Sequence, residues 1–483
     1  MKECKQTCQK REDLLSRLEK YSEEDYVPLH MPGAKRNTKI FSMGNPYGID
    51  ITEIDGFDNL HHATEIIADS MREAAQVFGA DETLYLINGS SAGILSAICG
   101  ATSRGDKILV ARNCHVSVYN AIYMNGLVPV YYYPDCDPVT GIYDGVNVEE
   151  IGHCVEKNPD IKAVVITSPT YEGNVSDIKA IAKYLHDRNI VFIVDEAHGA
   201  HFHMSEAFPQ SAVELGADAV IQSIHKTLPA FTQTALLHLN GDIINRDRVK
   251  MYWNIYQTTS PSYILMAGID RCVGILKEQG SEMFLRYTHM LKALRKRLEK
   301  LENIHLHKTD DISKIVLVVD SYWCGGKWLY EVLLKKYHIQ LEMASMKYVI
   351  AMTSIGDKQE YYDRFAKALE EIDEMISKDE AVGSKFNRKE KPDTMQICMS
   401  AEDMVMTPSE AIDRLTKEGG ELVSLENVKG RVSAVSVCMY PPGIPVVNYG
   451  EKVTQEIVEI LESGISAGLE VMGLKEGKIL CLK

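Results

Sequence analysis

Three polar segments follow short apolar runs of the sequence, and each has residue types that can do chemistry. The first is Asn88-Gly89-Ser90-Ser91, the second begins at Asp195, and the third is Ser223-Ile224-His225-Lys226. If the runs are parallel strands, their carboxyl ends meet at one edge of a sheet, where such folds bind ligands. We therefore expect the three segments to form one site.

Lys226 is the candidate nucleophile of this site. It lies between an apolar run and a loop, and burial there would lower the pKa of its amine toward neutrality. A deprotonated lysine amine forms a Schiff base with a carbonyl compound. For a single lysine, a solvated surface position is the simpler alternative.

Asp195 ends an apolar run, where a carboxylate is costly without a cationic partner. It can face a protonated heterocycle, bind a metal together with His198 and His201, or simply cap the following turn. Ser90 and Ser91 can hold a phosphate at a helix N-terminus, or can be an ordinary helix cap. No Walker lysine follows them and no GxGxxG is present, so nucleotide sites are disfavoured.

The order of these groups is what pyridoxal phosphate (PLP) needs. A phosphate-binding turn anchors the cofactor, a carboxylate keeps its pyridine nitrogen protonated, and a lysine forms the Schiff base. His115 follows another apolar run and is placed to stack on the pyridine ring, although a hydrogen-bonded core histidine is the alternative.

Eight stretches, in order over residues 30–451, resemble the ornithine/lysine/arginine decarboxylases of the aspartate aminotransferase superfamily, in the shorter form without an N-terminal wing. They are HMPG (30–33), FGADETLYLINGSSAGI (78–94), GDKILVARNCHVS (105–117), SPTYEGNVSD (168–177), VDEAHGAHF (194–202), SIHKTLPAFTQTALLH (223–238), QTTSPSY (257–263) and GRVSAVSVCMYPPGIPVVNYGE (430–451). The resemblance implies a fold type I PLP enzyme.

The resemblance also implies residue roles. Lys226 matches the Schiff-base lysine, Asp195 the partner of the pyridine nitrogen, and His115 the stacking histidine. The matches to phosphate-binding positions are Ser90, Ser91, Ser223 and His225.

Two further matches concern the phosphate of a neighbouring subunit and the cofactor's phenolic oxygen. A threonine of the 257–263 block reaches the phosphate across a dimer; Thr258 is the first match and Thr259 the second. His198 lies where the family places a residue near the phenolic oxygen. We therefore expect a homodimer or a higher homo-oligomer.

The implied activity is decarboxylation of a basic L-amino acid to CO2 and a diamine or polyamine precursor, with arginine ahead of lysine and then ornithine. Glu172 and Glu451 are the candidates for reading the substrate's cationic side chain. Ala34 and Val116 depart from the family's PGHK and HKS stretches. These departures leave the minimal PLP set intact and put the details of the substrate pocket in question.

Two alternatives stay open. An aminotransferase on the same scaffold needs a cation for the substrate's α-carboxylate, and Arg431 is the candidate. A catalytically silent PLP-binding protein is suggested by Ala34 and Val116 alone.

Short apolar runs alternate with helical stretches along the chain, and this pattern predicts an α/β fold with a mainly parallel sheet that positions these residues. The expected strands are 83–87, 107–111, 129–133, 163–167, 191–195 and 219–223, with two more at 315–319 and 348–352. The expected helices are 12–20, 92–101, 117–124, 178–187, 211–215 and 281–302.

We divide the chain into an aspartate-aminotransferase-like large domain that binds PLP, a smaller α/β domain and a C-terminal α+β domain. The divisions are an N-terminal arm 1–35, the large domain 36–270, the small domain 271–376, a polar linker 377–394 and the C-terminal domain 395–483.

The charge and cysteine content of the sequence limit the kinds of partner and site that we expect. The 483 residues carry 52 Lys and Arg against 68 Asp and Glu, a net charge of −16, which disfavours nucleic acid and anionic membranes as partners. The eleven cysteines are scattered without metal spacing, and the start has no apolar signal segment. We expect a cytoplasmic enzyme that binds a small molecule and no metal.

Overall fold

The structure is a computed structural model, and it describes residues 14–319, 324–383, 404–440, 443–466 and 468–483. Its centre is a seven-stranded sheet with the order β2-β8-β7-β6-β5-β3-β4. The bounds are β2 Glu82–Leu86, β3 Lys107–Ala111, β4 Val128–Tyr132, β5 Ile161–Thr167, β6 Val191–Asp195, β7 Ala219–Gln222 and β8 Ala235–Leu239.

The sheet is mainly parallel, as the sequence predicts. From β7 to β4 every neighbouring pair is parallel, whereas β8 is antiparallel to both β7 and β2. All six expected strands of this sheet are present. The sequence reading missed β8, a five-residue strand that is buried along its whole length.

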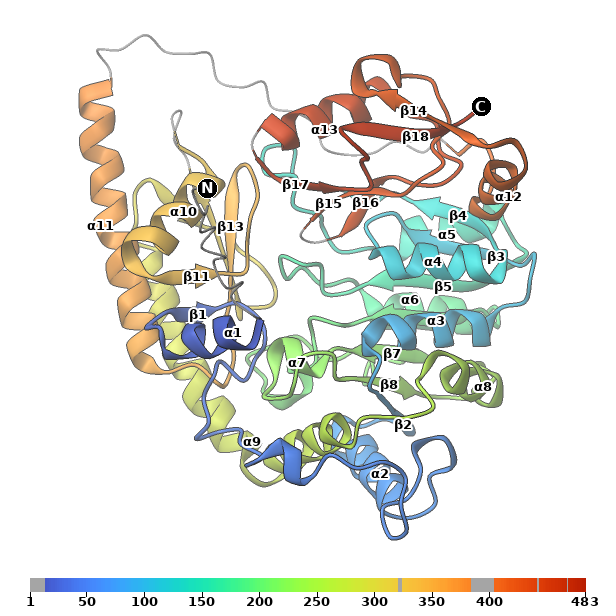
Figure 1. Ribbon diagram of the computed structural model, residues 1–483, viewed down its shortest axis with the longest axis horizontal. Helices are drawn as coiled ribbons and strands as arrows, with labels where there is room; N and C mark the ends of the chain where they lie inside the picture. The colour runs from blue at the N-terminus through green and yellow to red at the C-terminus, as the bar shows by residue number, and fades with distance from the viewer. Residues whose placement is uncertain (1–13, 320–323, 384–403, 441–442, 467) are drawn as a thin grey trace, which may run out of the picture.

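Helices cover both faces of this sheet. Helices α3 and α4 lie on one face and α5 and α6 on the other, and the two helices of each pair are in contact (Figure 1). The bounds are α2 Ile66–Phe78, α3 Gly89–Ala101, α4 Val116–Asn125, α5 Val148–Lys157, α6 Ile178–His186, α7 Ile224–Thr227 and α8 Arg246–Tyr256.

The helix expected at 211–215 is wrong, because this segment forms a turn. The Ser211 hydroxyl and the Ala212 N–H both donate to the buried Glu196 carboxylate, at 2.6 and 2.7 Å. These bonds hold the backbone at the carboxylate, and Gly216 ends the segment with φ +95°.

The small domain is built on a four-stranded antiparallel sheet with the order β12-β13-β10-β9. Both strands expected here are present, and the expected helix 281–302 is the second half of the long helix α9. The bounds are α9 Tyr263–Leu298, β9 Ile304–Leu306, β10 Lys314–Val319, α10 Gly326–Tyr337, β11 Ile339–Leu341, β12 Met343–Ala344, β13 Tyr348–Met352 and α11 Gln359–Gly383.

Two long helices bear on the proposed domain limits. Helix α9 runs unbroken through residues 270 and 271, so it belongs to both domains as we divide them. Helix α11 continues to Gly383 and therefore includes the first residues of the expected linker; residues 384–394 lie outside the described residues.

The C-terminal domain has its own apolar core and lies beside β4 and α4 of the large domain (Figure 1). Its helix α12 begins with a capping box between Thr407 and Glu410. The bounds are α12 Pro408–Glu418, β14 Gly420–Ser424, β15 Val437–Tyr440, β16 Ile444–Val447, α13 Gln455–Ser466, β17 Glu470–Met472 and β18 Lys478–Leu482.

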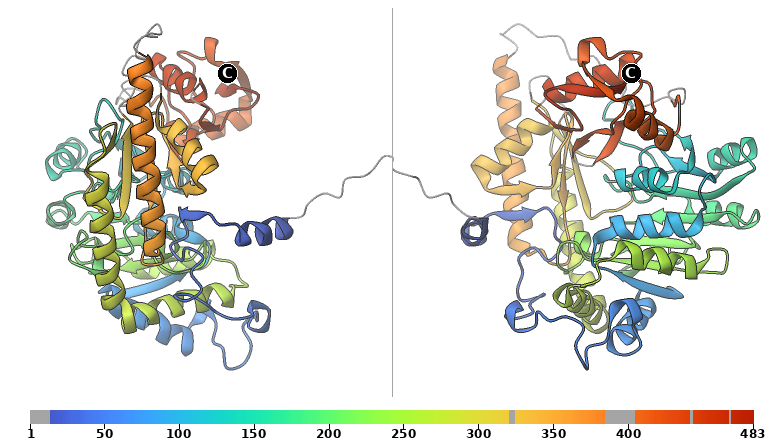
Figure 2. Two further views of the ribbon diagram at one scale, coloured as in Figure 1. Left: turned by 90° about the vertical axis from the view of Figure 1, so that its left-hand side faces the viewer. Right: turned by 45° about the vertical axis from the view of Figure 1, so that its right-hand side comes forward.

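The N-terminal arm has two parts. Strand β1, Val27–Leu29, is buried and pairs in parallel with β11 of the small domain. Helix α1, Leu14–Glu23, extends away from the body (Figure 2) and leaves Leu14, Leu15 and Leu18 more than half exposed. Single 3-10 turns complete the chain at Pro46–Gly48, Leu60–His62, Phe202–Met204 and Leu425–Asn427.

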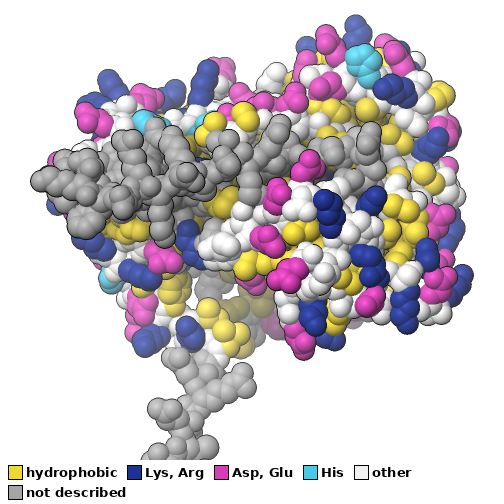
Figure 3. All heavy atoms as spheres, turned by 90° about the horizontal axis from the view of Figure 1, so that it is seen from above, with side chains coloured by type: hydrophobic (Ala, Val, Ile, Leu, Met, Phe, Trp, Pro, Cys, Tyr) yellow, Lys and Arg dark blue, Asp and Glu magenta, His cyan; other side chains and the backbone are white. Residues whose placement is uncertain are grey.

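The surface carries charges of both signs. On the face seen in Figure 3, Lys and Arg side chains are interspersed with Asp and Glu side chains. Within the described part of the chain, no helix is both long and apolar enough to cross a bilayer.

Candidate active site

The predicted site residues gather around one cavity of about 400 Å³ at the carboxyl ends of the parallel strands. The large domain, the N-terminal arm, the small domain and the C-terminal domain all contribute to its walls. Predicted residues in the lining are Ser90, Ser91, His115, Glu172, Asp195, His198, His225 and Lys226. Ser223 lies directly behind them, since its hydroxyl donates to Ser90 Oγ at 2.9 Å.

Lys226 belongs to α7, the single helical turn that follows β7. Its Nζ lies 3.0 Å from His198 Nε2. Burial lowers the pKa of the Lys226 amine, while the nearby Asp195 and Glu342 carboxylates oppose that shift. Burial also holds the pKa of His198 well below its usual range, and the Lys226 charge adds to this effect. At neutral pH His198 is therefore an uncharged partner of the lysine.

Asp195 is the last residue of β6 and is buried. One carboxylate oxygen accepts a hydrogen bond from the Ala197 N–H at 3.1 Å. Burial raises the pKa of Asp195 and the charge of Lys226 lowers it in part. A protonated ring nitrogen in the cavity would give this carboxylate the cationic partner that its burial requires.

The turn between β2 and α3 is shaped for an anion. Gly89 has φ +79°, a left-handed conformation that glycine adopts without strain, and it starts the 13-residue helix α3. The side chains of Gln257 and Gln233 fix the turn by accepting from the Asn88 N–H and donating to the Ile87 carbonyl, at 3.0 and 2.6 Å. The free backbone N–H groups of the first turn of α3, including those of Ser90 and Ser91, therefore form the positive end of the helix dipole. Both serines line the cavity.

His115 caps the N-terminus of α4, where its Nδ1 accepts from the Ser117 N–H at 3.3 Å. Burial and the charge of Lys226 lower its pKa to about 4, so the ring is neutral at pH 7. The C-terminal domain closes over this histidine: the Val116 N–H donates to the Gly443 carbonyl at 3.3 Å, and Tyr440 and Ile444 line the cavity.

The Nδ1 of His225, which lines the cavity, lies 2.7 Å from the Thr234 carbonyl. Because a carbonyl only accepts, this contact places the ring proton on Nδ1 and leaves Nε2 as an acceptor. Burial lowers the pKa of His225 to about 4.

This donor set fits PLP. Amides and hydroxyls at the start of α3 would hold the phosphate, Asp195 would pair with the pyridine nitrogen, and Lys226 lines the same cavity. A neutral His115 provides a flat ring beside them. The buried Nδ1 of His198 has no hydrogen-bond partner in the described residues, so this histidine has a polar atom left for a further group.

The alternative reading of Asp195, His198 and His201 as metal ligands does not hold. Among the described residues no group of three His, Cys, Asp or Glu side chains could hold a metal ion. His201 instead faces Asp311, with Nε2 3.1 Å from the carboxylate.

Sequence reasoning missed a carboxylate on the opposite wall of the cavity. Glu342 lies between β11 and β12 of the small domain and lines the cavity. Its Oε1 accepts from the Tyr171 hydroxyl at 2.9 Å and its Oε2 from the Met31 N–H of the arm at 2.8 Å. The Tyr171 ring packs edge-on against His198, with centroids 4.8 Å apart. No motif marks Glu342, because only the packing of the small domain brings it to the cavity.

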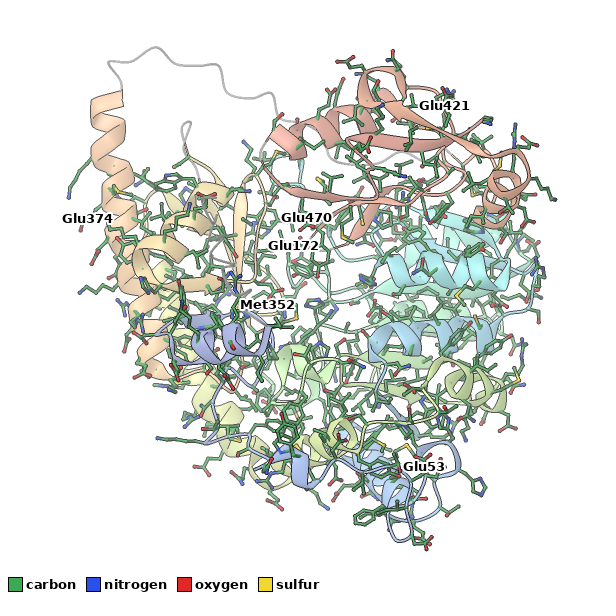
Figure 4. All side chains as sticks on the ribbon, viewed as in Figure 1. Glu53, Glu172, Met352, Glu374, Glu421 and Glu470 are labelled. Carbon is green, nitrogen blue, oxygen red and sulfur yellow. The ribbon has the colours of Figure 1, made fainter. Side chains whose placement is uncertain are left out.

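Of the two glutamates suggested for the substrate side chain, only Glu172 lines the cavity. It lies centrally between the small domain and the large sheet (Figure 4) and accepts from the Tyr348 hydroxyl at 2.7 Å. Burial raises its pKa. The suggestion that Glu451 binds the substrate side chain is wrong, because Glu451 is buried outside the cavity lining and pairs with Arg112 at 2.8 Å.

Thr258 and Thr259 are outside the lining found in the described part of this one chain. The Thr258 carbonyl lies 2.7 Å from His61 Nε2, and Thr259 is exposed. Their expected role concerns a neighbouring subunit and stays a prediction. Arg431, the cation that an aminotransferase would need, donates to Glu421 and to the Leu482 carbonyl, both at 3.0 Å.

Comparison with known proteins agrees with this site. Residues 13–317 match the major domain of the Orn/Lys/Arg decarboxylases, and residues 392–471 match their C-terminal domain. The chain is 30% identical to the arginine decarboxylase of Bacillus subtilis over 486 residues, which cover 96% of each protein.

Solved structures share the fold. The lysine decarboxylase of Francisella novicida matches with a TM-score of 0.75 and 20% identity, over 97% of this chain and 80% of that one. The ureidoglycine-glyoxylate aminotransferase of Bacillus subtilis matches with a TM-score of 0.56 and 16% identity, over 72% and 93%. These matches confirm the fold type I architecture, and the family matches show that the chain belongs to the Orn/Lys/Arg decarboxylases, which are PLP-dependent enzymes.

Proposed function

We propose that this enzyme decarboxylates a basic L-amino acid, with arginine ahead of lysine and ornithine. The observation that carries the proposal is the pair of glutamates, Glu342 and Glu172, in the lining of the cavity that also contains Lys226. A buried cation needs such partners. The order of substrates rests on the name of the Bacillus subtilis relative, an arginine decarboxylase.

Bound PLP supplies the electron sink for the carbanion that loss of CO2 leaves on the substrate. The residues of the chain prepare that step. Lys226, with its lowered pKa, gives a share of neutral amine that can attack a carbonyl. Asp195 would hold the proton of the ring nitrogen in place, which would keep the sink positively charged. The start of α3, with Ser90 in the lining and Ser223 behind it, would hold the phosphate end.

His198 is placed to form a hydrogen bond with the Lys226 amine. The two nitrogens are 3.0 Å apart, which is hydrogen-bond distance. Because burial keeps His198 uncharged, its Nε2 lone pair can accept a hydrogen bond from the Lys226 ammonium and orient the amine, while the same burial disfavours a proton resident on the ring.

Glu342 is our candidate for the group that binds the substrate's side-chain cation. Each of its oxygens accepts one hydrogen bond, from Tyr171 and from Met31, and a carboxylate oxygen has room for a second donor. These two bonds also fix the carboxylate, so a substrate would not have to order it. Glu172 is the second candidate in the wall.

We also propose that the enzyme is a cytoplasmic homodimer whose product serves polyamine synthesis. The exposed leucines of α1 and the exposed Thr259 and Ser260 beside the half-buried Thr258 support a surface that a second copy covers. The homodimer would bring Thr258, or Thr259, to the phosphate of the neighbouring site.

A substrate panel tests the function. Purified enzyme with PLP should release CO2 from L-arginine, L-lysine or L-ornithine with kcat/KM at least about 100-fold above that for L-glutamate or L-leucine. A preference for either of the last two would contradict a cationic substrate. Transfer of the amino group to a keto acid without CO2 release would instead indicate an aminotransferase.

A further inference from the structure

A fully buried cluster of ionisable side chains lies behind the cavity and is not used in the reaction above. It consists of His201, Asp311 and Lys314, whose side chains are 2%, 0% and 1% exposed. Asp311 Oδ1 faces His201 Nε2 at 3.1 Å, and Asp311 Oδ2 faces Lys314 Nζ at 3.2 Å. The carboxylate therefore joins a residue of the large domain to the first residue of β10.

The cluster touches both sides of the active site. Lys314 Nζ donates to the carbonyl of His198 at 3.4 Å. The Asp311 N–H donates to the carbonyl of Gly173 at 2.9 Å, directly beside Glu172. Two residues of the small domain thus hold the backbone of the active site. Lys314 binds the backbone of His198, the partner of Lys226, and Asp311 binds the backbone beside Glu172.

Gly173 shows how closely these segments approach. Its φ is +111°, and a Cβ built on it would lie 2.9 Å from Lys314 Cγ and 3.2 Å from Asp311 Cβ. A side chain at this position would push β10 away from the loop. The contact between the loop and the cluster therefore depends on glycine.

Stability alone is a weak reason for this cluster. Removing two charges from water costs several kcal/mol per ion, and well-packed apolar side chains of similar volume often serve a fold as well or better. Burial would raise the pKa of Asp311, but the neighbouring Lys314 and His201 lower it well below its usual range. The carboxylate is therefore ionised and keeps a cation close to the site.

Lys314 acts on the groups around the reactive amine through its charge. Burial is the main cause that lowers the pKa values of Lys226 and His198, and the charge of Lys314 lowers both further. The other titratable groups that line the cavity with Lys226 are Asp195 at the end of β6, His115 at α4, His225 in α7, Tyr143, Tyr171 and Glu172 of the large domain, Glu342 of the small domain and Tyr440 of the C-terminal domain.

We propose that Lys314 is a positioning residue, which from the small domain fixes the backbone of His198 opposite Lys226 and, by its charge, favours the unprotonated amine. Asp311 holds Lys314 in place through its carboxylate, and its backbone N–H, which bonds the Gly173 carbonyl, fixes the loop beside Glu172. The inference rests on the proposed function, because it assigns this cluster to the same reaction.

The test compares Lys314→Met with the double variant Asp311→Asn/Lys314→Met. The single variant leaves Asp311 buried without its cation and can fail to fold, whereas the double variant removes both charges at nearly constant volume. Lys335→Met is the matched control, since Lys335 is an exposed lysine of α10 paired with Glu331.

The first readout is the pH titration of the visible absorbance of the lysine-bound cofactor, which requires no turnover. We expect the midpoint to rise by about one pH unit, a tenfold change in proton affinity, in Lys314→Met and by less in the double variant. Lys335→Met should keep the wild-type midpoint. The second readout is kcat, which should fall at least about tenfold in both variants while KM changes less.

A folded double variant with the wild-type midpoint and kcat would overturn the proposal. If basic amino acids prove not to be substrates, the absorbance titration still tests Lys314. If the wild-type protein shows no visible absorbance with PLP, the proposed function itself fails.

Discussion

The amine of Lys226 lies 3.0 Å from Nε2 of His198, the first contact in a series that crosses the cavity. The His198 ring packs on Tyr171, and the Tyr171 hydroxyl donates to Glu342 of the small domain. One wall thus connects the nucleophile with the carboxylate that we assign to the substrate. The large and small domains must keep a fixed relative position for this wall to form.

Lys226→Ala should remove the visible absorbance of the lysine-bound cofactor and lower turnover at least about 1,000-fold, because the nucleophile is lost. Spectra and CO2 release measure both effects. Lys183→Ala is the matched control, since Lys183 lies on the exposed side of α6. A Lys226→Ala protein with the wild-type spectrum and rate would end the assignment of the nucleophile.

Asp195→Asn should still bind PLP but lose about 100-fold or more in kcat, since a neutral amide cannot stabilise a protonated ring nitrogen. The amide has nearly the same size and can keep the contact with the Ala197 N–H. Cofactor affinity, followed by fluorescence, separates binding from rate. Full activity in this variant would mean that the nitrogen's partner lies elsewhere.

The local parts of this site could be predicted from the sequence. Asp195 ends an apolar strand and Lys226 follows one, so strand-end logic alone places them at the same edge of the sheet. Ser90 and Ser91 follow from the glycine turn before α3 by the same reasoning. The positions of these residues in the fold follow from the residues next to them in the chain, so the sequence alone predicts them.

The distant parts could not be predicted. Glu342 reaches the cavity because β11 and β12 pack there, and its short strands give no periodic signal. Glu451 lies in a matching motif, yet Arg112, far away in sequence, takes its carboxylate. Strand β8 could not be predicted because ALLHL is a short, almost wholly apolar run, and such a run has no periodicity that separates a buried strand from a buried helix.

Glu342→Gln should raise KM for the basic substrate about 10- to 100-fold with a smaller effect on kcat, because a charged hydrogen bond is replaced by a neutral one. The amide can keep one contact, to Tyr171 or to Met31. Glu172→Gln is the comparison within the same wall. If only Glu172→Gln raises KM, the side-chain cation binds Glu172 and our assignment of Glu342 is wrong.

Glu196 predicts a pH dependence of stability. Burial raises its pKa to about 7, although Ser211, Ala212 and Gln222 donate to its carboxylate. The folded state therefore binds this proton more tightly than the unfolded state does. Between pH 4.5 and 7 the free energy of unfolding should fall by ~3 kcal/mol from this group, and above pH 7 its contribution should stay constant.

Urea unfolding at several pH values measures that slope. Glu196→Gln has no proton to lose and should show a shallower decline between pH 4.5 and 7 than the wild-type protein. Glu156→Gln, at an exposed glutamate of α5, is the control. Equal slopes in the wild type and Glu196→Gln would show that this carboxyl does not titrate in that range.

Mixed dimers test whether two subunits share each site. Thr258 and Thr259 lie outside the cavity lining in the described part of one chain, so any role at the phosphate must be at the neighbour's site. We expect Lys226→Ala chains and Thr258→Ala/Thr259→Ala chains to be nearly inactive alone. In a mixed dimer, one site combines the intact lysine of one chain with the intact threonines of the other.

Random mixing in equal amounts should therefore restore about a quarter of the wild-type activity, since half of the dimers are mixed and each has one competent site. The measurement is CO2 release after the two variants are unfolded and refolded together, with each variant refolded alone as the control. Size-exclusion chromatography must show dimers in every sample. Dimers that form without any gain over the two parents would mean that each site is complete within its own chain.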